Sequence, residues 1–335
     1  MRRLGVLTSG GDAPGMNAAI RAVVRTALHY ELEVYGIRHG FHGLMHDDMV
    51  QMSSRSVGDI IHRGGTILRT ARAEEFRTEE GKKRALAVLE SRGLEGLVVI
   101  GGDGSFRGAA ELAASGKVKV VGIPGTIDND IPGTDFTVGF DTAVNNVVDA
   151  INKIRDTATS HERVYVVEVM GRHTGFIALS AGLAGGAESI LIPEEPYDLE
   201  ELCARVLSGY RRGKSHSIIV VAEGIEGGPV PPGRGCELES PGFKVGRYVQ
   251  QRTGLETRVI ILGHIQRGGT PTVLDRTLAT LFGARAVEVL RAGRSGVMVG
   301  VQGQQVVEVP FEEVFARKKA IPHEVWQLAN VLSLT

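Results

Sequence analysis

Two aspartates two residues apart are the most conspicuous chemical feature of this sequence. They belong to the segment Pro124-Gly-Thr-Ile-Asp-Asn-Asp130, which follows an apolar run and should therefore lie at the end of a strand. Alternate residues of an extended chain face the same side, so Asp128 and Asp130 can reach one site, with Thr126 beside them. A hydroxyl nucleophile needs a positioned general base, and we assign that role to Asp128. The alternative is an Asx-type turn that caps Ile131-Pro132.

Glycine-rich loops follow two further apolar runs. Gly101-Gly-Asp-Gly-Ser105 places Asp103 among glycines, so backbone amides can approach a triphosphate while the carboxylate holds Mg²⁺. The alternative role for Asp103 is an ordinary helix N-cap. Gly10-Gly11 also offers open backbone amides before a helix. The alternative is a tight turn that requires glycine for its backbone conformation. The chain contains neither the Walker pattern nor the dinucleotide-binding fingerprint.

Cationic side chains occur near the ends of several apolar runs. A sugar phosphate is a dianion, for which arginine forks are preferred partners. A single arginine is ordinarily a solvated surface residue, but this group should share one edge of a sheet and form one large site. The group comprises Arg72, Arg163, Arg172, Arg258, His264 and Arg267.

The segments that must position these residues alternate between strand and helix patterns. Short apolar, β-branched runs bounded by glycine or charge indicate buried parallel strands, and amphipathic stretches between them indicate helices. This alternation predicts an α/β fold, and 335 residues are enough for two lobes. The predicted strands are 4–7, 97–100, 118–123, 164–169, 218–222 and 259–262. The predicted helices are 16–29, 78–91 with Thr78 as N-cap, 143–156 and 274–290, and residues 226–242 are expected to form a mobile surface insertion.

Composition narrows the class of protein. An apolar fraction of 42% with 23% charged residues is typical of a folded globular chain. The formal net charge of −1 argues against nucleic-acid or anionic-membrane partners, and no apolar stretch is long enough to span a bilayer. Cys203 and Cys236 form no metal-binding or disulfide pattern. We therefore expect a cytoplasmic protein.

Taken together, the segments closely resemble the bacterial ATP-dependent 6-phosphofructokinase family over nearly the whole chain. The likeness rests on Leu4-Gly-Val-Leu-Thr-Ser-Gly-Gly-Asp12, Pro124 to Asp130, Met170-Gly-Arg-His173 and Gly263-His-Ile-Gln-Arg-Gly-Gly269. It implies the phosphofructokinase fold, with two three-layer α/β/α lobes and mainly parallel sheets. Residues 1–139 with 266–316 would form the ATP-binding lobe. Residues 140–265 with 317–335 would form the lobe for fructose 6-phosphate and effectors.

The resemblance also implies a reaction and the residues that perform it. The reaction is the Mg²⁺-dependent transfer of a phosphoryl group from ATP to the 1-hydroxyl of fructose 6-phosphate, with Asp103 at the metal. The implied catalytic residues are Asp128, Thr126, Asp130, Arg72 and Arg172, and the ATP-binding residues are Gly11, Arg72, Ala73, Gly102, Asp103, Gly104 and Ser105. Fructose 6-phosphate would contact Thr126, Ile127, Asp128, Arg163, Met170, Gly171, Arg172, Glu223, Arg258, His264, Ile265, Gln266 and Arg267.

The family pattern further implies assembly and regulation. Arg163 and Arg258 match residues that reach across from a neighbouring subunit, which implies a homotetramer. ADP or phosphoenolpyruvate would bind an effector site, although Arg21 and Arg25 could equally form i,i+4 pairs on a helix surface. The effector residues implied are Arg21, Arg25, Arg155, Gly186, Ala187, Glu188, Arg212, Lys214, Ser215 and His216.

The sequence departs from the family pattern at several positions, and rival functions on the same fold must be weighed. Phe41 stands where many relatives have Tyr near the nucleotide, Ala73 replaces Cys or Phe, and Ser215 replaces Lys. Pyrophosphate-dependent relatives carry Asp in place of Gly104 and Lys in place of Gly125, so glycine at both positions favours ATP. A catalytically silent sensor on the same fold would lack the base or the metal carboxylate, and this sequence retains both.

Overall fold

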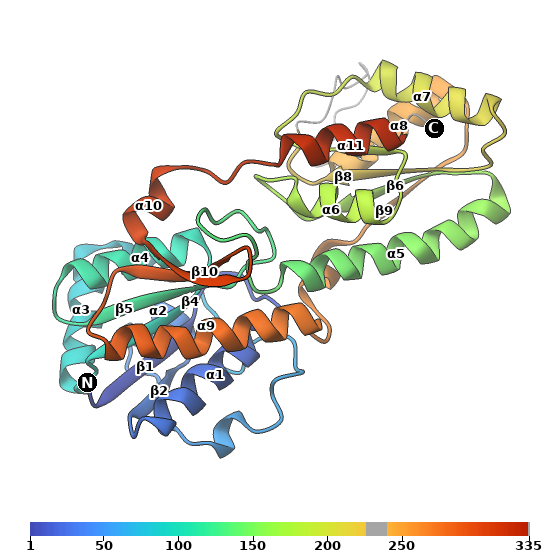
Figure 1. Ribbon diagram of the computed structural model, residues 1–335. Coiled ribbons are helices and arrows are strands. Elements are labelled where there is room, and N and C mark those ends of the chain that lie inside the picture. The colour runs from blue at the N-terminus through green and yellow to red at the C-terminus, as the bar shows by residue number, and fades with distance from the viewer. Residues whose placement is uncertain (226–239, 334–335) are drawn as a thin grey trace. The chain divides into compact units, whose positions relative to one another are not determined.

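The computed structural model describes residues 1–225 and 240–333. The chain forms two compact units, each built around its own sheet (Figure 1). The first unit contains Met1–Thr142 and Arg267–Lys319, and the second contains Ala143–Gln266 and Ala320–Thr335. The predicted α/β fold class is therefore confirmed. The assignment of ATP to one lobe, and of sugar phosphate and effectors to the other, remains a prediction.

A seven-stranded sheet forms the centre of the first unit. Its order is β11-β10-β5-β4-β1-β2-β3, in which only the edge strands β11 and β3 run antiparallel to their neighbours. Every residue of the central strand β4 is buried, as expected for a parallel sheet covered on both faces. The strands are β1 (Arg3–Thr8), β2 (Glu33–Ile37), β3 (Met49–Met52), β4 (Gly96–Gly101), β5 (Lys119–Pro124), β10 (Val297–Gln302) and β11 (Gln305–Pro310).

Helices cover both faces of this sheet (Figure 1). Helices α1 and α9 pack closely because Gly283 has no side chain; a Cβ there would lie 2.6 Å from the Cβ of Ala22. Helix α4 packs on β4 and β5 and also contacts α10. The helices are α1 (Met16–His29), α2 (Gly40–Met45), α3 (Glu79–Ser91), α4 (Asp103–Ala114), α9 (Val273–Arg291) and α10 (Phe311–Ala316), with short 3₁₀ turns at Arg55–Val57 and Glu74–Arg77.

The second unit has a four-stranded, wholly parallel sheet of order β7-β8-β6-β9. Helix α8 lies against β6 and β9, and α6 lies against β7 and β8. The strands are β6 (Val164–Val169), β7 (Ser189–Leu191), β8 (Ser217–Ala222) and β9 (Thr257–Ile261). The helices are α5 (Phe140–His161), which begins in the first unit, α6 (Phe176–Ala184), α7 (Leu199–Arg211), α8 (Pro241–Thr253) and α11 (His323–Ser333), with a 3₁₀ turn, η3, at Gly263–Arg267.

The predicted elements are present, with differences at their ends. Thr78 caps α3 as expected, since its side chain accepts a hydrogen bond from the Gly81 amide at 3.1 Å. Helix α5 extends well beyond the predicted 143–156 at both ends. The sequence patterns missed β2, β3, β7, β10 and β11.

The expected insertion at 226–242 is described only in its last residues. Residues 226–239 lie outside the described part of the chain, whereas Pro241 and Gly242 form the first turn of α8. Proline suits a first helical turn because its missing N–H would have no partner there. Among the described residues, no helix has the length and apolar character needed to cross a membrane.

Candidate functional site

The loop after β5 carries the predicted general base. The Asp128 amide donates to Thr126 Oγ1 at 3.3 Å, and this hydroxyl lies 3.5 Å from Asp128 Oδ2. The hydroxyl of Thr137 donates to the Thr126 carbonyl at 2.6 Å, and the Thr137 amide donates to Asn129 Oδ1 at 3.0 Å. Asn129 adopts a φ of +52°, a region that asparagine tolerates better than most residues. The local turn is therefore closed by the side chain of Thr126 and not by that of Asp128. Asp128 itself is half-buried.

Negative charge from two loops converges near Asp130. The pKa of Asp130 is raised to about 6, first by burial and then by the carboxylates of Asp128 and Asp103. The loops after β4 and β5 are neighbours, because the two strands run parallel and pair at Gly101 and Pro124. The loops also touch, because the Gly125 amide donates to the Gly101 carbonyl at 3.0 Å.

Asp103 begins α4, and the N-cap position belongs to Gly102. The N-cap alternative for Asp103 is therefore wrong. Its exposed carboxylate accepts a hydrogen bond from Arg107 Nε at 2.9 Å, an exposed i,i+4 pair of the kind that contributes little to stability. This leaves Asp103 able to take a cation.

The donor set near Asp103 fits magnesium. Mg²⁺ commonly takes one or two protein carboxylates and completes its shell with substrate phosphates and water. Within residues 1–225 and 240–333, no cluster of three or more His, Cys, Asp or Glu side chains is arranged to hold a metal. A metal at Asp103 would therefore depend on the phosphates of a bound nucleotide.

The first glycine loop combines a turn with an open face. Gly10 has a φ of +85° and makes the turn, whereas Gly11 lies under the guanidinium group of Arg267. A Cβ on Gly11 would lie 2.7 Å from Arg267 Nη1, and that nitrogen donates to the Asp12 carbonyl at 3.1 Å. Arg267, predicted to contact the sugar phosphate, thus lies beside a predicted ATP loop.

The remaining nucleotide residues differ in exposure. Gly104 is exposed, and a Cβ there would meet no atom within 4 Å, while Ser105 is buried. Arg72 is exposed and forms no ion pair with any residue that the structure describes. Ala73 is half-buried against the core, where Phe41 stacks on Phe76 with ring centroids 4.3 Å apart. Because Phe41 is only 5% exposed, it offers little aromatic face to a nucleotide.

In the second unit, predicted sugar-phosphate residues gather at the carboxyl ends of the strands. The Gly171 amide lies 3.4 Å from Glu223 Oε1, and the Met170 amide donates to Gln266 Oε1 at 3.2 Å. These contacts join the loops after β6, β8 and β9. Gln266 is wholly buried and also donates to the Gly263 carbonyl at 2.9 Å, so its side chain joins loops and does not face solvent. Among the predicted sugar-phosphate residues at this edge, Arg172, His264 and Ile265 are exposed.

Arg163 and Arg258 lie at the opposite edge of the same sheet. Arg163 precedes β6 and Arg258 is the second residue of β9, so both are at the amino ends of parallel strands. The expectation that all six cationic residues share one edge is therefore wrong. Glu256 pairs with both arginines, at 2.8 Å from Arg163 Nε, and this contact raises the pKa of Arg163 and lowers that of Glu256.

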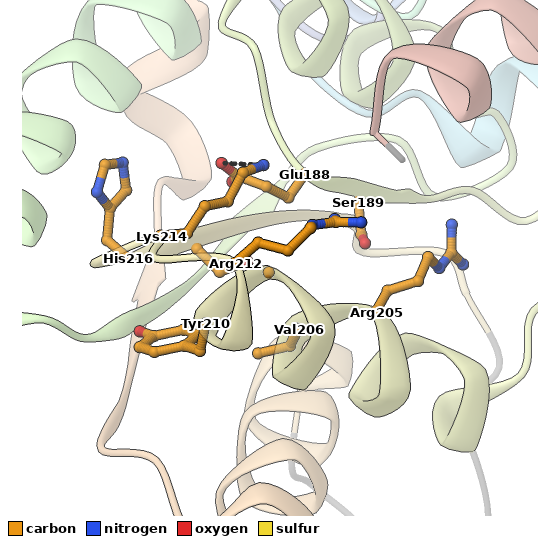
Figure 2. A pocket seen from close by; sticks show the side chains of 10 residues that line it. Glu188, Ser189, Arg205, Val206, Tyr210, Arg212, Lys214 and His216 are labelled. Carbon is orange, nitrogen blue, oxygen red and sulfur yellow. Dashed lines mark ion pairs between the residues drawn. The ribbon is translucent and has the colours of Figure 1, made fainter. Parts of the chain in front are cut away.

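A small basic pocket occupies the amino ends of β7 and β8 (Figure 2). Of the predicted effector residues, Arg212, Lys214 and His216 line it, as does Glu188, whose Oε1 lies 3.8 Å from Lys214 Nζ. Arg205 on α7 also lines the pocket, and no sequence motif marks it as a site residue. The interior holds only about 10 Å³, room for one water molecule, so an anion would bind at its mouth.

The other predicted effector residues are divided between the units. Arg155 donates to the carbonyls of Gly185 and Gly186, the latter at 3.1 Å, and so holds the loop before β7. Ala187 and Ser215 are half-buried neighbours of the pocket residues. Arg21 and Arg25 belong to α1 in the first unit and form no ion pair with any described residue, which removes the i,i+4 alternative.

Comparison with known proteins gives one consistent result. A sequence model described as "Phosphofructokinase" matches residues 3–290. The chain is 56% identical over 334 residues to the "ATP-dependent 6-phosphofructokinase" of Halothermothrix orenii and 57% identical to that of Bacillus subtilis, covering all of each protein.

Solved structures agree in fold. The phosphofructokinase of Saccharomyces cerevisiae superimposes with a TM-score of 0.85 at 36% identity, over 99% of this chain and 47% of the yeast chain. A pyrophosphate-dependent phosphofructokinase from Marinobacter aquaeolei also gives 0.85, over 97% of this chain and 86% of that chain, but at 24% identity this shows the fold alone. With the family model and both bacterial relatives matching along its length, the chain belongs to the phosphofructokinase family.

Proposed function

We propose that this protein is a cytoplasmic, Mg²⁺-dependent glycolytic 6-phosphofructokinase that converts ATP and fructose 6-phosphate to ADP and fructose 1,6-bisphosphate. The full-length bacterial relatives carry the name of this activity. The observation that carries the proposal is that Asp103, Asp128 and Asp130 all follow the neighbouring parallel strands β4 and β5, which pair at Gly101 and Pro124 and whose loops are joined by the Gly125 amide. Phosphoryl transfer to a hydroxyl needs both a base for the acceptor and a carboxylate for the metal at the same phosphates.

Asp128 is the base in this proposal. As the 1-hydroxyl oxygen of the sugar forms its bond to the γ-phosphorus, its proton passes to the Asp128 carboxylate. The bond between that phosphorus and the β–γ bridging oxygen breaks, and the electron pair leaves with ADP. Thr126, within 3.5 Å of Asp128 Oδ2, orients the carboxylate, and Asp130 shares its charged surroundings.

Cations complete the proposed site. Magnesium, held at Asp103, supplies neutralisation of the phosphate charge when bound. Arg72 and Arg172 are both exposed, and neither is engaged by an acidic side chain among the described residues, so their guanidinium groups remain available to the phosphoryl group. Arg163, Met170, Gly171, Glu223, Arg258, His264 and Arg267 would hold fructose 6-phosphate.

The geometry at two glycines supports ATP over pyrophosphate. Gly104 faces open space, which leaves room for the rest of the nucleotide. At Gly125 a Cβ would lie 3.0 Å from Ile100 Cγ2 and 3.2 Å from Met16 Cε, inside the buried core. A lysine, as in the pyrophosphate-dependent pattern, would therefore have to displace its neighbours.

A coupled assay of fructose 6-phosphate phosphorylation tests the donor. Purified protein should turn over with MgATP and be at least about a hundredfold less active with pyrophosphate, a difference of about 2.7 kcal/mol. Chelation of Mg²⁺ should abolish the ATP reaction. Equal or greater turnover with pyrophosphate would overturn the donor assignment, and no turnover with either donor would favour a silent sensor.

Assembly and regulation form the second part of the proposal. A homotetramer is supported by Arg163 and Arg258, which Glu256 holds at the strand edge opposite Met170 and Glu223. ADP or phosphoenolpyruvate would bind as anionic effectors at the mouth of the pocket in Figure 2.

Changing Arg212 to alanine should raise the effector concentration for half-maximal response about tenfold or more, without changing turnover when no effector is present. Arg211→Ala, an exposed neighbour outside the pocket lining, is the control.

A further inference from the structure

Lys319 is half-buried and places its ammonium group against the loop that carries Asp128 and Asp130. It is the last residue of the first unit, after α10, where the chain passes into the second unit. Its Nζ donates to Asn129 Oδ1 and to the Asp135 carbonyl, both at 2.9 Å. Ordering a long lysine side chain against two acceptors costs conformational entropy, so this placement calls for a reason.

Asn129 is the acceptor through which Lys319 reaches the acids. Asn129 separates Asp128 from Asp130 and is itself 4% exposed, with a φ of +52°. Its Oδ1 also accepts from the Thr137 amide at 3.0 Å, and its Nδ2 donates to the Asp135 carbonyl at 3.2 Å. Lys319 and Asn129 thus share one carbonyl acceptor and form a closed hydrogen-bonded unit beneath the loop.

The charge of Lys319 also acts on the acids. Desolvation outweighs the attraction of Asp135 and Asp130, so the pKa of Lys319 is lowered to about 8, and in return Lys319 lowers the pKa of Asp130. With Asp128 and Asp103 repelling Asp130, a nearby cation offsets negative charge that the loop must hold in a fixed arrangement.

We propose that Lys319 is a positioning residue for phosphoryl transfer: its ammonium group fixes Asn129 and thereby the directions in which Asp128 and Asp130 point. This inference rests on the proposed function. It assigns a task to a residue distant in sequence from every motif of the site. A misplacement of about 1 Å in such a group can reduce turnover by about a hundredfold.

The competing reading is that Lys319 merely fastens the end of the first unit. Both readings predict some loss of stability, but only positioning predicts a loss of kcat in molecules that remain folded. Lys319→Met removes the charge and both hydrogen bonds at similar length. Lys319→Arg retains a donor and the charge. Lys318→Met is the matched control, because Lys318 is exposed and forms no ion pair within the described residues.

Steady-state kinetics with MgATP and fructose 6-phosphate distinguish the two roles of Lys319. The measurements are made at a temperature where circular dichroism shows each variant folded. We expect Lys319→Met to lower kcat about tenfold or more, with both KM values within about threefold of wild type. Lys319→Arg should recover part of the loss, and Lys318→Met should match wild type. A kcat for folded Lys319→Met within about twofold of wild type would overturn the proposal.

A second variant keeps the proposal testable if Lys319→Met does not fold. Asn129→Ala removes the acceptor and should show the same fall in kcat with little change in KM. Wild-type kcat in folded Asn129→Ala would equally refute the role of Lys319. The wild-type enzyme is assayed in parallel to keep the two proposals apart. If the wild type does not turn over with ATP, the proposed function fails; if the wild type is active and the folded variants are equally active, only the role of Lys319 fails.

Discussion

At the scale of single residues, the proposed site concentrates negative charge that the folded state does not favour. Asp130 has a native pKa of about 6 against an ordinary 3.8, first because it is buried and then because Asp128 and Asp103 are near. Between these pH values the native state binds more protons than the unfolded state, so this residue lowers the free energy of unfolding as pH rises. Above pH 6 the ionised Asp130 therefore destabilises the fold.

Removing this charge should stabilise the protein. Asp130→Asn is expected to raise the free energy of unfolding at pH 7.5 by about 1–3 kcal/mol, and the gain should shrink toward pH 4. Urea unfolding at several pH values measures this. Asp156→Asn, an exposed aspartate on α5, should change little at any pH. A loss of stability at pH 7.5 in Asp130→Asn would contradict the proposed charge cluster.

At the scale of elements, α5 begins where a distant acid caps it. Asp275, in the first turn of α9 and wholly buried, accepts hydrogen bonds from the amides of Gly139 at 2.7 Å and Thr142 at 2.8 Å. Burial raises the pKa of Asp275, and these hydrogen bonds lower it. Nearby, the Val138 amide donates to the Pro124 carbonyl at 2.8 Å, so the cap also steadies the loop with Asp128.

Loss of the cap should therefore destabilise the first unit. Asp275→Ala leaves buried amides without acceptors and is expected to lower the free energy of unfolding by about 2–4 kcal/mol. Asp275→Asn keeps one acceptor oxygen and should cost less. Urea unfolding compares the two. An alanine variant as stable as wild type would show that the cap has no energetic role.

The sequence patterns predict the central strands correctly, because buried parallel strands consist of continuous apolar runs. Strands 4–7, 97–100 and 164–169 of the prediction lie within β1, β4 and β6. The missed β7 spans only Ser189–Leu191, too short to register as a run. The early start of α5 depends on Asp275, which is far away in sequence.

The candidate site was predictable in its loops but not in its supports. Gly102, Asp103 and Asp128 follow strands and were found from that order. The same order places Arg163 before β6, so its position at the amino edge could have been read from the sequence. The position of Lys319 could not be read from the sequence, because its partner Asn129 is distant in the chain and no local pattern marks the contact.

At the scale of the whole molecule, the proposed homotetramer predicts sites shared between subunits, to which Arg163 and Arg258 would contribute. If Arg258 acts on a neighbouring subunit, then mixing two inactive variants should restore activity. In a mixed tetramer, an Arg258→Ala subunit still has an intact Asp128. Its neighbour, an Asp128→Asn subunit, would supply the missing Arg258 and so complete one site. Hybrid tetramers formed by dissociation and reassociation should turn over with ATP.

The controls for this mixing experiment are each variant reassociated alone, which should stay inactive. Mixing Asp128→Asn with Thr126→Ala tests the specificity of rescue, because both changes affect one subunit's loop and no hybrid site would be intact. If Asp128→Asn and Arg258→Ala also fail to complement each other in mixed tetramers of verified composition, Arg258 does not act across the interface.

The most direct test of the account is the kcat of Asp128→Asn with saturating MgATP and fructose 6-phosphate. The amide has nearly the shape of the carboxylate and can still accept from Thr126, but it is a much weaker base. We predict a fall in kcat of about 10²–10⁴-fold, with both KM values within a few fold of wild type and an unchanged fold. A kcat within about tenfold of wild type would contradict the claim that Asp128 takes the proton of the acceptor hydroxyl.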